Sequence, residues 1–152
     1  MLYTIGEMAD RLGVPASTLR YYDKEGLLPF VGRSDSGIRM FKDSDFEWLQ
    51  IIECLKKTGM RLADIRHFVE MAMQGDDTIA ERLELIVRQK EQVAHQIREL
   101  EQTLKILEFK QWYYETAKEA GTTEHLQNMP LEQLPEAYRK IRSTLRGETS
   151  DR

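Results

Sequence analysis

The chain has 152 residues, enough for one ordinary domain or for a small domain followed by a long helical arm. A net charge of −4 excludes a protein that binds nucleic acid through bulk positive charge, and a single cysteine excludes an intrachain disulfide framework. No apolar run approaches the roughly 20 residues of a membrane span, and the N-terminal segment lacks the pattern of a signal peptide, so we expect a cytoplasmic protein.

Residues 4–13 predict a short helix with recognisable ends. Thr4 followed by Glu7 fits a capping box, in which each residue satisfies a backbone N–H of the other. Gly13 is typical of a helix stop. The residues spaced as one apolar helical face are Ile5, Met8, Ala9 and Leu12.

A second helix is predicted from about Ala16 to Glu25, with Leu19 and Tyr22 pointing inward. The residues expected on its outward side are Ser17, Thr18, Arg20, Tyr21 and Lys24. Two helices joined by a short glycine-containing turn, about 4–26, form the helix-turn-helix pattern. The alternative is a helical hairpin whose outward polar residues have no function beyond contact with solvent.

Residues 30–43 are rich in glycine, serine and aspartate and predict a short β-hairpin, or wing. Arg33, Arg39 and Lys42 lie on or near it, and basic side chains on a small loop suit phosphate contacts. A solvated loop without function is the alternative.

A second helix pair is expected over 44–74. Ser44 with Glu47 predicts the start of its first helix, and Arg61 lies near the start of its second. The expected buried face of the first helix consists of Trp48, Ile51, Ile52 and Leu55.

Residues 77–120 predict one helix on the order of 60 Å long. The heptad-spaced positions along it are Ile79, Leu83, Ile86, Val93, Ile97, Leu100, Leu104 and Leu107. Since the rest of the chain offers no helix of comparable length, we expect the same helix of a second copy to cover this stripe. A helical bundle within one chain is the alternative. Residues 121–152 predict a short helix, roughly Leu131 to Leu145, and a disordered tail from Gly147.

Several strings of the first 30 residues occur together in one known family. They are Ile5-Gly6-Glu7-Met8-Ala9, Leu12-Gly13-Val14, Thr18-Leu19-Arg20-Tyr21-Tyr22-Asp23 and Gly26-Leu27-Leu28-Pro29. Together they closely resemble the N-terminal signature of the MerR family of transcription regulators. The resemblance implies a mainly α fold with a winged helix-turn-helix domain over 1–75, followed by a long dimerisation helix that pairs antiparallel in a homodimer.

The resemblance also implies a partner, double-stranded DNA at a palindromic promoter site, where the family distorts the DNA and acts with RNA polymerase. Arg20 and Tyr21 would enter or flank the major groove. The other expected DNA contacts are Thr4, Ser17, Thr18, Tyr22, Lys24, Arg33, Arg39, Lys42 and Arg61. Phe41 stands where the family more often has tyrosine, so a hydroxyl contact there is lost.

Cys54 leaves two interpretations open: a small buried hydrophobe, or a reactive thiol. The run from Glu53 to Met60 resembles a subgroup in which a cysteine of this helix senses aldehydes or other electrophiles. We expect no metal or other cofactor, because the three histidines are scattered in the sequence. We expect no enzyme, because Cys54 lacks a visible base. A coiled-coil adaptor whose N-terminal helices bind a protein is the competing functional class.

Overall fold

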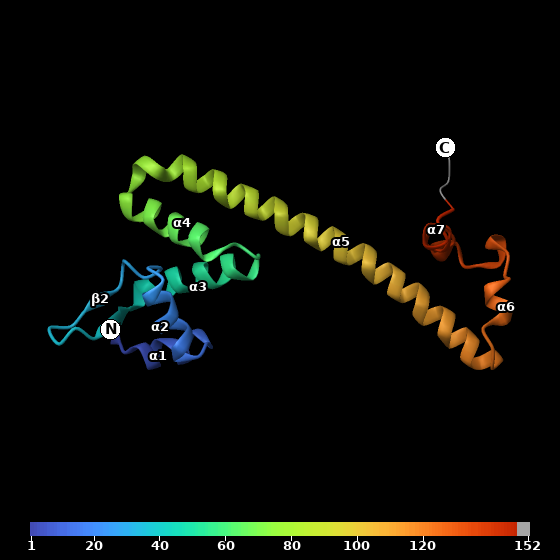
Figure 1. Ribbon diagram of the computed structural model, residues 1–152, viewed down its shortest axis with the longest axis horizontal. Helices are drawn as coiled ribbons and strands as arrows, with labels where there is room; N and C mark the ends of the chain where they lie inside the picture. Colours follow the sequence, from blue (N-terminus) through green and yellow to red (C-terminus); the bar gives the residue numbers. More distant parts are fainter. Residues whose placement is uncertain (149–152) are drawn as a thin grey trace. The chain divides into compact units, whose positions relative to one another are not determined.

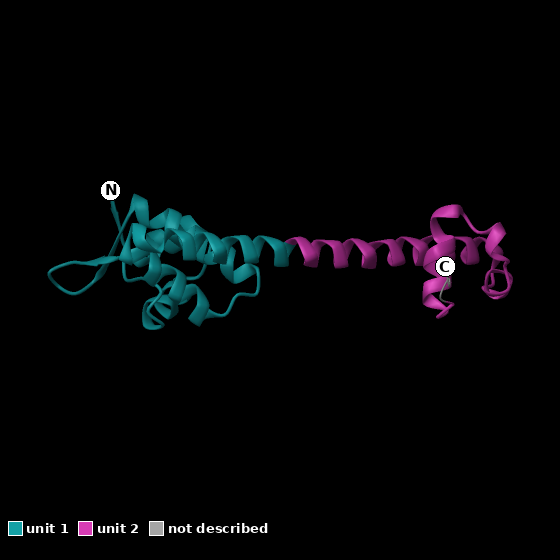
Figure 2. Cartoon of the chain, turned by 90° about the horizontal axis from the view of Figure 1, so that it is seen from above, with its two compact units in different colours: residues 1–93 teal, residues 94–152 magenta. Residues whose placement is uncertain are grey.

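The computed structural model describes residues 1–148, which fold mainly into α-helices and confirm the expected fold class (Figure 1). The chain divides into two compact units, Met1–Val93 and Ala94–Arg152 (Figure 2). Among the described residues, no helix combines the length and the apolar character needed to cross a membrane.

Two short helices, α1 (Ile5–Leu12) and α2 (Ala16–Lys24), form the helix-turn-helix. The Thr4 N–H donates to the Glu7 carboxylate at 2.8 Å, and the Glu7 N–H donates to the Thr4 hydroxyl at 3.3 Å. Gly13 ends α1 with φ 74°, in the left-handed region that favours glycine. The predicted capping box and helix stop are therefore confirmed.

The wing belongs to a small antiparallel sheet with strand order β1-β3-β2. Strands β2 (Gly32–Arg33) and β3 (Arg39–Lys42) form the expected hairpin. Strand β1 (Leu2–Tyr3) was not predicted; it pairs Leu2 with Lys42 and Tyr3 with Phe41. The N-terminal residues thus fix the base of the wing.

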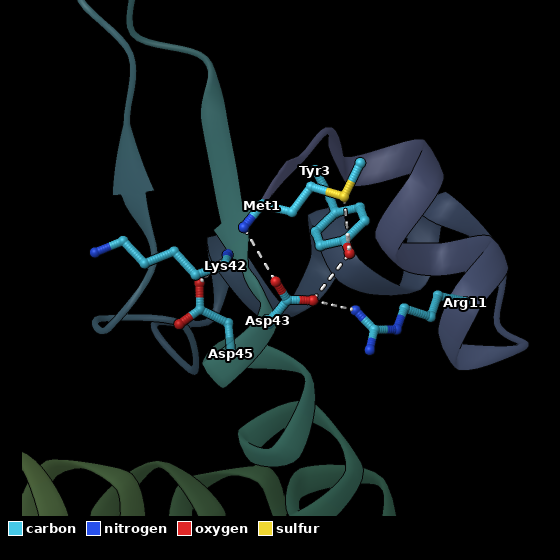
Figure 3. Close-up of polar contacts among 6 residues, drawn as sticks. All are labelled: Met1, Tyr3, Arg11, Lys42, Asp43 and Asp45. Carbon is cyan, nitrogen blue, oxygen red and sulfur yellow. Dashed lines mark hydrogen bonds and ion pairs between the residues drawn. The ribbon is translucent and has the colours of Figure 1, made fainter.

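Helix α3 (Asp43–Lys57) begins directly after β3. The Lys42 N–H donates to the Asp45 carboxylate at 2.8 Å, and Asp45 is buried (Figure 3). The predicted start at Ser44 with Glu47 is wrong, because the strand runs into the helix without a loop and the capping carboxylate comes from Asp45.

The buried face of α3 also differs from the prediction. Leu49 is fully buried, whereas Ile51 keeps 39% of its surface exposed. The spacing explains this, since Leu49, Ile52 and Leu55 follow one helical stripe and Ile51 lies on the next one. Cys54 is also exposed, so the buried-hydrophobe interpretation of this residue is wrong.

Helix α4 (Leu62–Gln74) packs on α3 and completes the core of the first unit. The largest fully buried side chains of this core are Met8, Leu19, Tyr22, Leu27, Leu28, Phe41, Leu49, Ile52, Ile65 and Val69. They come from the helix-turn-helix, the wing and both following helices. One core therefore fixes all elements that could meet DNA.

A 3-10 turn (Asp76–Thr78) leads into α5 (Ile79–Ala120), a single helix of 42 residues. Its heptad positions are apolar, and all of them except the half-buried Val93 are exposed within one chain; Leu83 is 61%, Leu100 68% and Leu107 60% exposed. The described residues contain no second helix of this length.

In the second unit, α6 (Glu124–Gln127), a 3-10 turn (Leu131–Gln133) and α7 (Glu136–Leu145) follow α5. The single helix predicted from Leu131 is wrong, because Pro135 precedes α7 and separates it from the turn. Gly147 and Glu148 still bond to the end of α7. The prediction of a disordered tail concerns mainly residues 149–152, which lie outside the described residues.

Candidate nucleic-acid interface

The outward side of α2 carries the side chains that the sequence predicted there. Ser17, Arg20 and Lys24 are exposed, Thr18 is half-buried, and Tyr21 keeps 45% of its surface exposed. The inward side of the helix places Leu19 in the core. The helix therefore presents one polar and basic face from a rigid base.

The wing is a tight hairpin whose tip is held by its own backbone. The Ser34 N–H donates to the Ile38 carbonyl at 2.8 Å, and Gly37 takes φ 80° at the turn. Lys42, at the base of the wing, is exposed. The hairpin thus holds a basic residue at each end, since Arg33 on β2 is exposed as well.

Asp23 on α2 binds two arginines of the wing, a link that the sequence analysis missed. Its carboxylate accepts a hydrogen bond from the Arg39 guanidinium and lies 3.4 Å from Nη2 of Arg33. Nη1 of Arg39 also donates to the Val31 carbonyl at 2.7 Å. The sequence did contain a signal for this link, because Asp23 is an acidic residue on a helix that was expected to face DNA. The pairing half-buries Arg39 and ties the wing to α2.

Tyr22 is fully buried and must be removed from the expected DNA contacts. Its hydroxyl donates to the Glu53 carboxylate and accepts from Nζ of Lys56 at 3.1 Å. Burial, followed by the hydrogen bond to Glu53, raises the pKa of the Tyr22 hydroxyl. Tyr22 therefore links α2 to α3 instead of facing solvent.

A second polar cluster surrounds Asp43, at the first residue of α3 (Figure 3). Its carboxylate accepts hydrogen bonds from Arg11 at 2.8 Å, Tyr3 at 2.9 Å and the α-amino group of Met1 at 3.1 Å. These donors, Arg11 first, lower the pKa of Asp43 to about 2. The cluster joins β1, α1 and α3 beside the base of the wing.

The remaining predicted contacts lie at helix starts. Thr4 is exposed at the start of α1, and Arg61 is exposed before α4, where its Nε lies 3.0 Å from Asp64. The sequence analysis also missed Arg66, which donates to the Glu25 carbonyl at 3.2 Å and covers Gly26 at the end of α2.

The described residues contain no group of three or more histidine, cysteine, aspartate or glutamate side chains that could hold a metal ion. Cys54 stands on α3 next to Glu53, the residue that bonds Tyr22. It is the chain's single thiol, and its exposure leaves it accessible.

Comparison with known proteins identifies the family whose members share these features. The family model for MerR HTH family regulatory proteins matches residues 3–72, and the model "MerR, DNA binding" matches residues 46–108. An HTH-type transcriptional regulator of Haemophilus influenzae is 48% identical over 136 residues, which cover 90% of this chain and 98% of that protein.

The chain belongs to the MerR family. It is a MerR-type DNA-binding transcriptional regulator, as the resemblance predicted, and this family consists of regulators rather than enzymes.

Two solved MerR structures extend the match. A crystal structure of HiNmlR, a MerR family regulator lacking the sensor domain, bound to promoter DNA, is 49% identical with a TM-score of 0.75. The match covers 82% of this chain and 98% of the HiNmlR chain. A MerR family regulator from Bacillus thuringiensis is 41% identical, with a TM-score of 0.68, covering 72% of this chain and 96% of that one.

Proposed function

We propose that this MerR-type regulator binds a palindromic promoter site as a homodimer and controls transcription by distorting the promoter DNA. The observation that carries the proposal is the HiNmlR structure, a relative of 49% identity bound to promoter DNA. The exposed polar face of α2 beside a basic wing supports the same role for this chain.

The apolar stripe of α5 supports the homodimer. Its residues recur at heptad spacing, and all but Val93 are exposed in a single chain, which costs free energy unless a partner helix covers them. A second copy, paired antiparallel, would cover the stripe and present two DNA-binding modules. Such a pair requires a site with matching two-fold symmetry.

The proposed DNA contacts divide by type. Arg20 and Tyr21 on the exposed face of α2 would read or flank bases in the major groove. The proposed phosphate contacts are Thr4, Ser17, Thr18, Lys24, Arg33, Lys42 and Arg61. Arg39, which is paired with Asp23, would contact the DNA backbone.

Footprinting of the purified protein on genomic DNA, followed by titration of the recovered duplex, tests the proposal. We expect protection of a palindromic site and a steep loss of affinity with added salt, because phosphate contacts release counterions. The Arg20→Ala variant should lower both affinity and sequence preference, whereas Arg98→Ala, on α5, should leave both unchanged. An adaptor protein would show neither a palindromic footprint nor the salt dependence.

Promoter distortion is tested by transcription with RNA polymerase. If the regulator acts by reshaping DNA, its effect should depend on the length of the spacer between the −35 and −10 elements. A regulator that only blocks the polymerase would repress at every spacer length.

We also propose that Cys54 is where an electrophile acts. The thiol is exposed, and it lies one residue from Glu53, which bonds Tyr22 of α2. Treatment with N-ethylmaleimide should add one label per chain and change transcription from the target promoter. The Cys54→Ser variant should show neither effect. If N-ethylmaleimide changed transcription in that variant as much as in the wild type, the proposal would be contradicted.

A further inference from the structure

The second unit contains a cavity of about 220 Å³ between the last turns of α5 and the segments that follow it. Phe109, Trp112 and Tyr113 line it from α5, and Leu126 and Leu134 line it from the following segments. The cavity lies entirely within this unit. Its size exceeds the roughly 150 Å³ of an engineered apolar cavity that holds one benzene ring.

The aromatic side chains of the wall pack against one another. The rings of Phe109 and Trp112 lie 6.2 Å apart at an angle of 23°, and the Tyr138 ring of α7 lies 5.5 Å from each of them. Phe109, Leu126 and Leu134 are almost fully buried. A flat apolar ligand would therefore meet preformed ring faces instead of ordering loose side chains.

The charged side chains that line the cavity are all positive: Lys110, Arg142 and Arg146. None of the three has a carboxylate within 4.0 Å among the described residues, although the chain holds 26 acidic and 22 basic residues. The negative charge of Glu148 acts on Arg142 and favours its protonated form. Among the described residues, the side chains that line the cavity therefore carry positive charge without a carboxylate in ion-pair contact.

The three basic side chains differ in how many hydrogen-bond donors they leave free for a ligand. Arg142 is buried, and its two terminal nitrogens donate to the carbonyls of Met129 at 2.6 Å and Gln127 at 3.0 Å, so it mainly holds the wall. Arg146 is exposed and uses one nitrogen on the Gln127 carbonyl. Nζ of Lys110 lies 4.9 Å from the centre of the Tyr113 ring. Lys110 and Arg146 thus retain donors for an anion.

The aromatic wall of the cavity faces away from the apolar stripe of α5, whereas Lys110 lies beside the stripe, about 60° from Leu107 around the helix axis. Phe109 follows Leu107 by two residues, which turns its side chain about 200° around the helix axis. Pairing along the stripe would therefore leave the aromatic wall uncovered, with Lys110 at the edge of the pair.

We propose that this cavity binds a small aromatic carboxylate of one ring, with the ring against Phe109 and Trp112 and the carboxylate at Lys110 and Arg146. The site goes beyond the proposed DNA-binding function and does not depend on it. A cationic ligand would meet like charge at Lys110 and Arg146.

Isothermal titration calorimetry of the full chain with benzoate, without DNA, tests the proposal. We expect saturable binding with one site per chain. Benzamide, with the same ring and no charge, should bind about tenfold more weakly, because the charge-assisted hydrogen bonds are lost. Acetate, with the charge and no ring, should not bind measurably.

Variants locate the site. Lys110→Gln and Arg146→Gln should each weaken benzoate binding several-fold, whereas Lys118→Gln, also exposed on α5, should not change it. Leu145→Trp keeps every charge but fills the cavity, and it should abolish binding while circular dichroism shows unchanged helix content. The absence of saturable binding, or equal affinity in Leu145→Trp, would overturn the proposal.

Discussion

A single carboxylate connects the two parts of the proposed DNA-binding surface. Asp23 lies on α2, and its two arginine partners lie on the two strands of the wing. Nε of Arg39 is buried without a hydrogen-bond partner among the described residues, so Asp23 and the Val31 carbonyl hold this guanidinium. Asp23 is thus a positioning residue, although its charge opposes that of DNA.

These two roles of Asp23 predict opposite results for the Asp23→Asn variant. Removal of a negative charge strengthens DNA binding, whereas release of the wing weakens it. We expect affinity to fall about five- to tenfold, because the variant loses charge-assisted hydrogen bonds that fix the wing. Fluorescence anisotropy with the target duplex at fixed salt measures this. Asp35→Asn, the same charge change at the exposed wing tip, should bind equally well or more tightly. Tighter binding by both variants would contradict the positioning role.

Asp43 makes the stability of the first unit sensitive to acid. Its pKa is lowered from 3.8 to about 2, mainly by Arg11, so the folded state favours the ionised carboxylate. The contribution is therefore present above about pH 4 and is lost as the pH falls from 3.8 toward 2. Asp43→Asn should lower the Tm at pH 7, and the difference from the wild type should shrink over that acidic window. Circular dichroism melts from pH 2 to 7 measure this, and a gap that stays constant would contradict it.

At the scale of single elements, local signals predicted both ends of α1 correctly. Thr4, Glu7 and Gly13 determine the ends of α1 through neighbours within a few residues, so their pattern is visible in the sequence. The strand β1 is different, because its partners Phe41 and Lys42 are about 40 residues away. The cap at Asp45 was missed for the same reason, since the sheet decides where β3 ends.

The functional site shows the same division. The outward face of α2 followed from helical periodicity, which also predicted that Tyr22 is buried. Its assignment as a DNA contact came from the family resemblance and conflicts with its bonds to Glu53 and Lys56. The pairing of Asp23 with Arg33 and Arg39 depends on how the wing folds back, which no local pattern encodes.

The stripe of α5 leads to a prediction for this element. Leu100→Glu places a charge in the proposed dimer interface, where an exposed leucine would otherwise become buried. Burial of a leucine contributes about 2 kcal/mol per side chain, so the variant should be monomeric at concentrations where the wild type is a dimer. Analytical ultracentrifugation measures this, with Gln102→Glu on the opposite face as the control. An unchanged sedimentation coefficient for Leu100→Glu would contradict the proposed interface.

At the scale of the whole molecule, the charge balance requires that basic residues act by position. Residues 1–75 contain ten lysine or arginine and eleven aspartate or glutamate residues, a net charge of 10 − 11 = −1. Affinity for DNA must therefore come from a few side chains aimed at phosphates, with the acids turned elsewhere or paired, as Asp23 and Asp43 are.

The number of such contacts can be counted by salt dependence. Each phosphate contact contributes about −0.9 to the slope of log K against log salt. Lys42→Gln should reduce the magnitude of this slope by about two for a dimer, with little change in sequence preference. Lys118→Gln, the same change on α5, should leave the slope unaltered. An unaltered slope in Lys42→Gln would show that this residue makes no phosphate contact.

The junction between β3 and α3 has a consequence for the evolution of this chain. Lys42 is both the last residue of a strand and the residue that precedes a helix, so no spare backbone separates them. One inserted residue would rotate α3 by about 100° relative to the strand, and Leu49 and Ile52 would leave the core. Substitutions can accumulate at this junction, but an insertion or deletion there would disrupt the core of the first unit and unfold it.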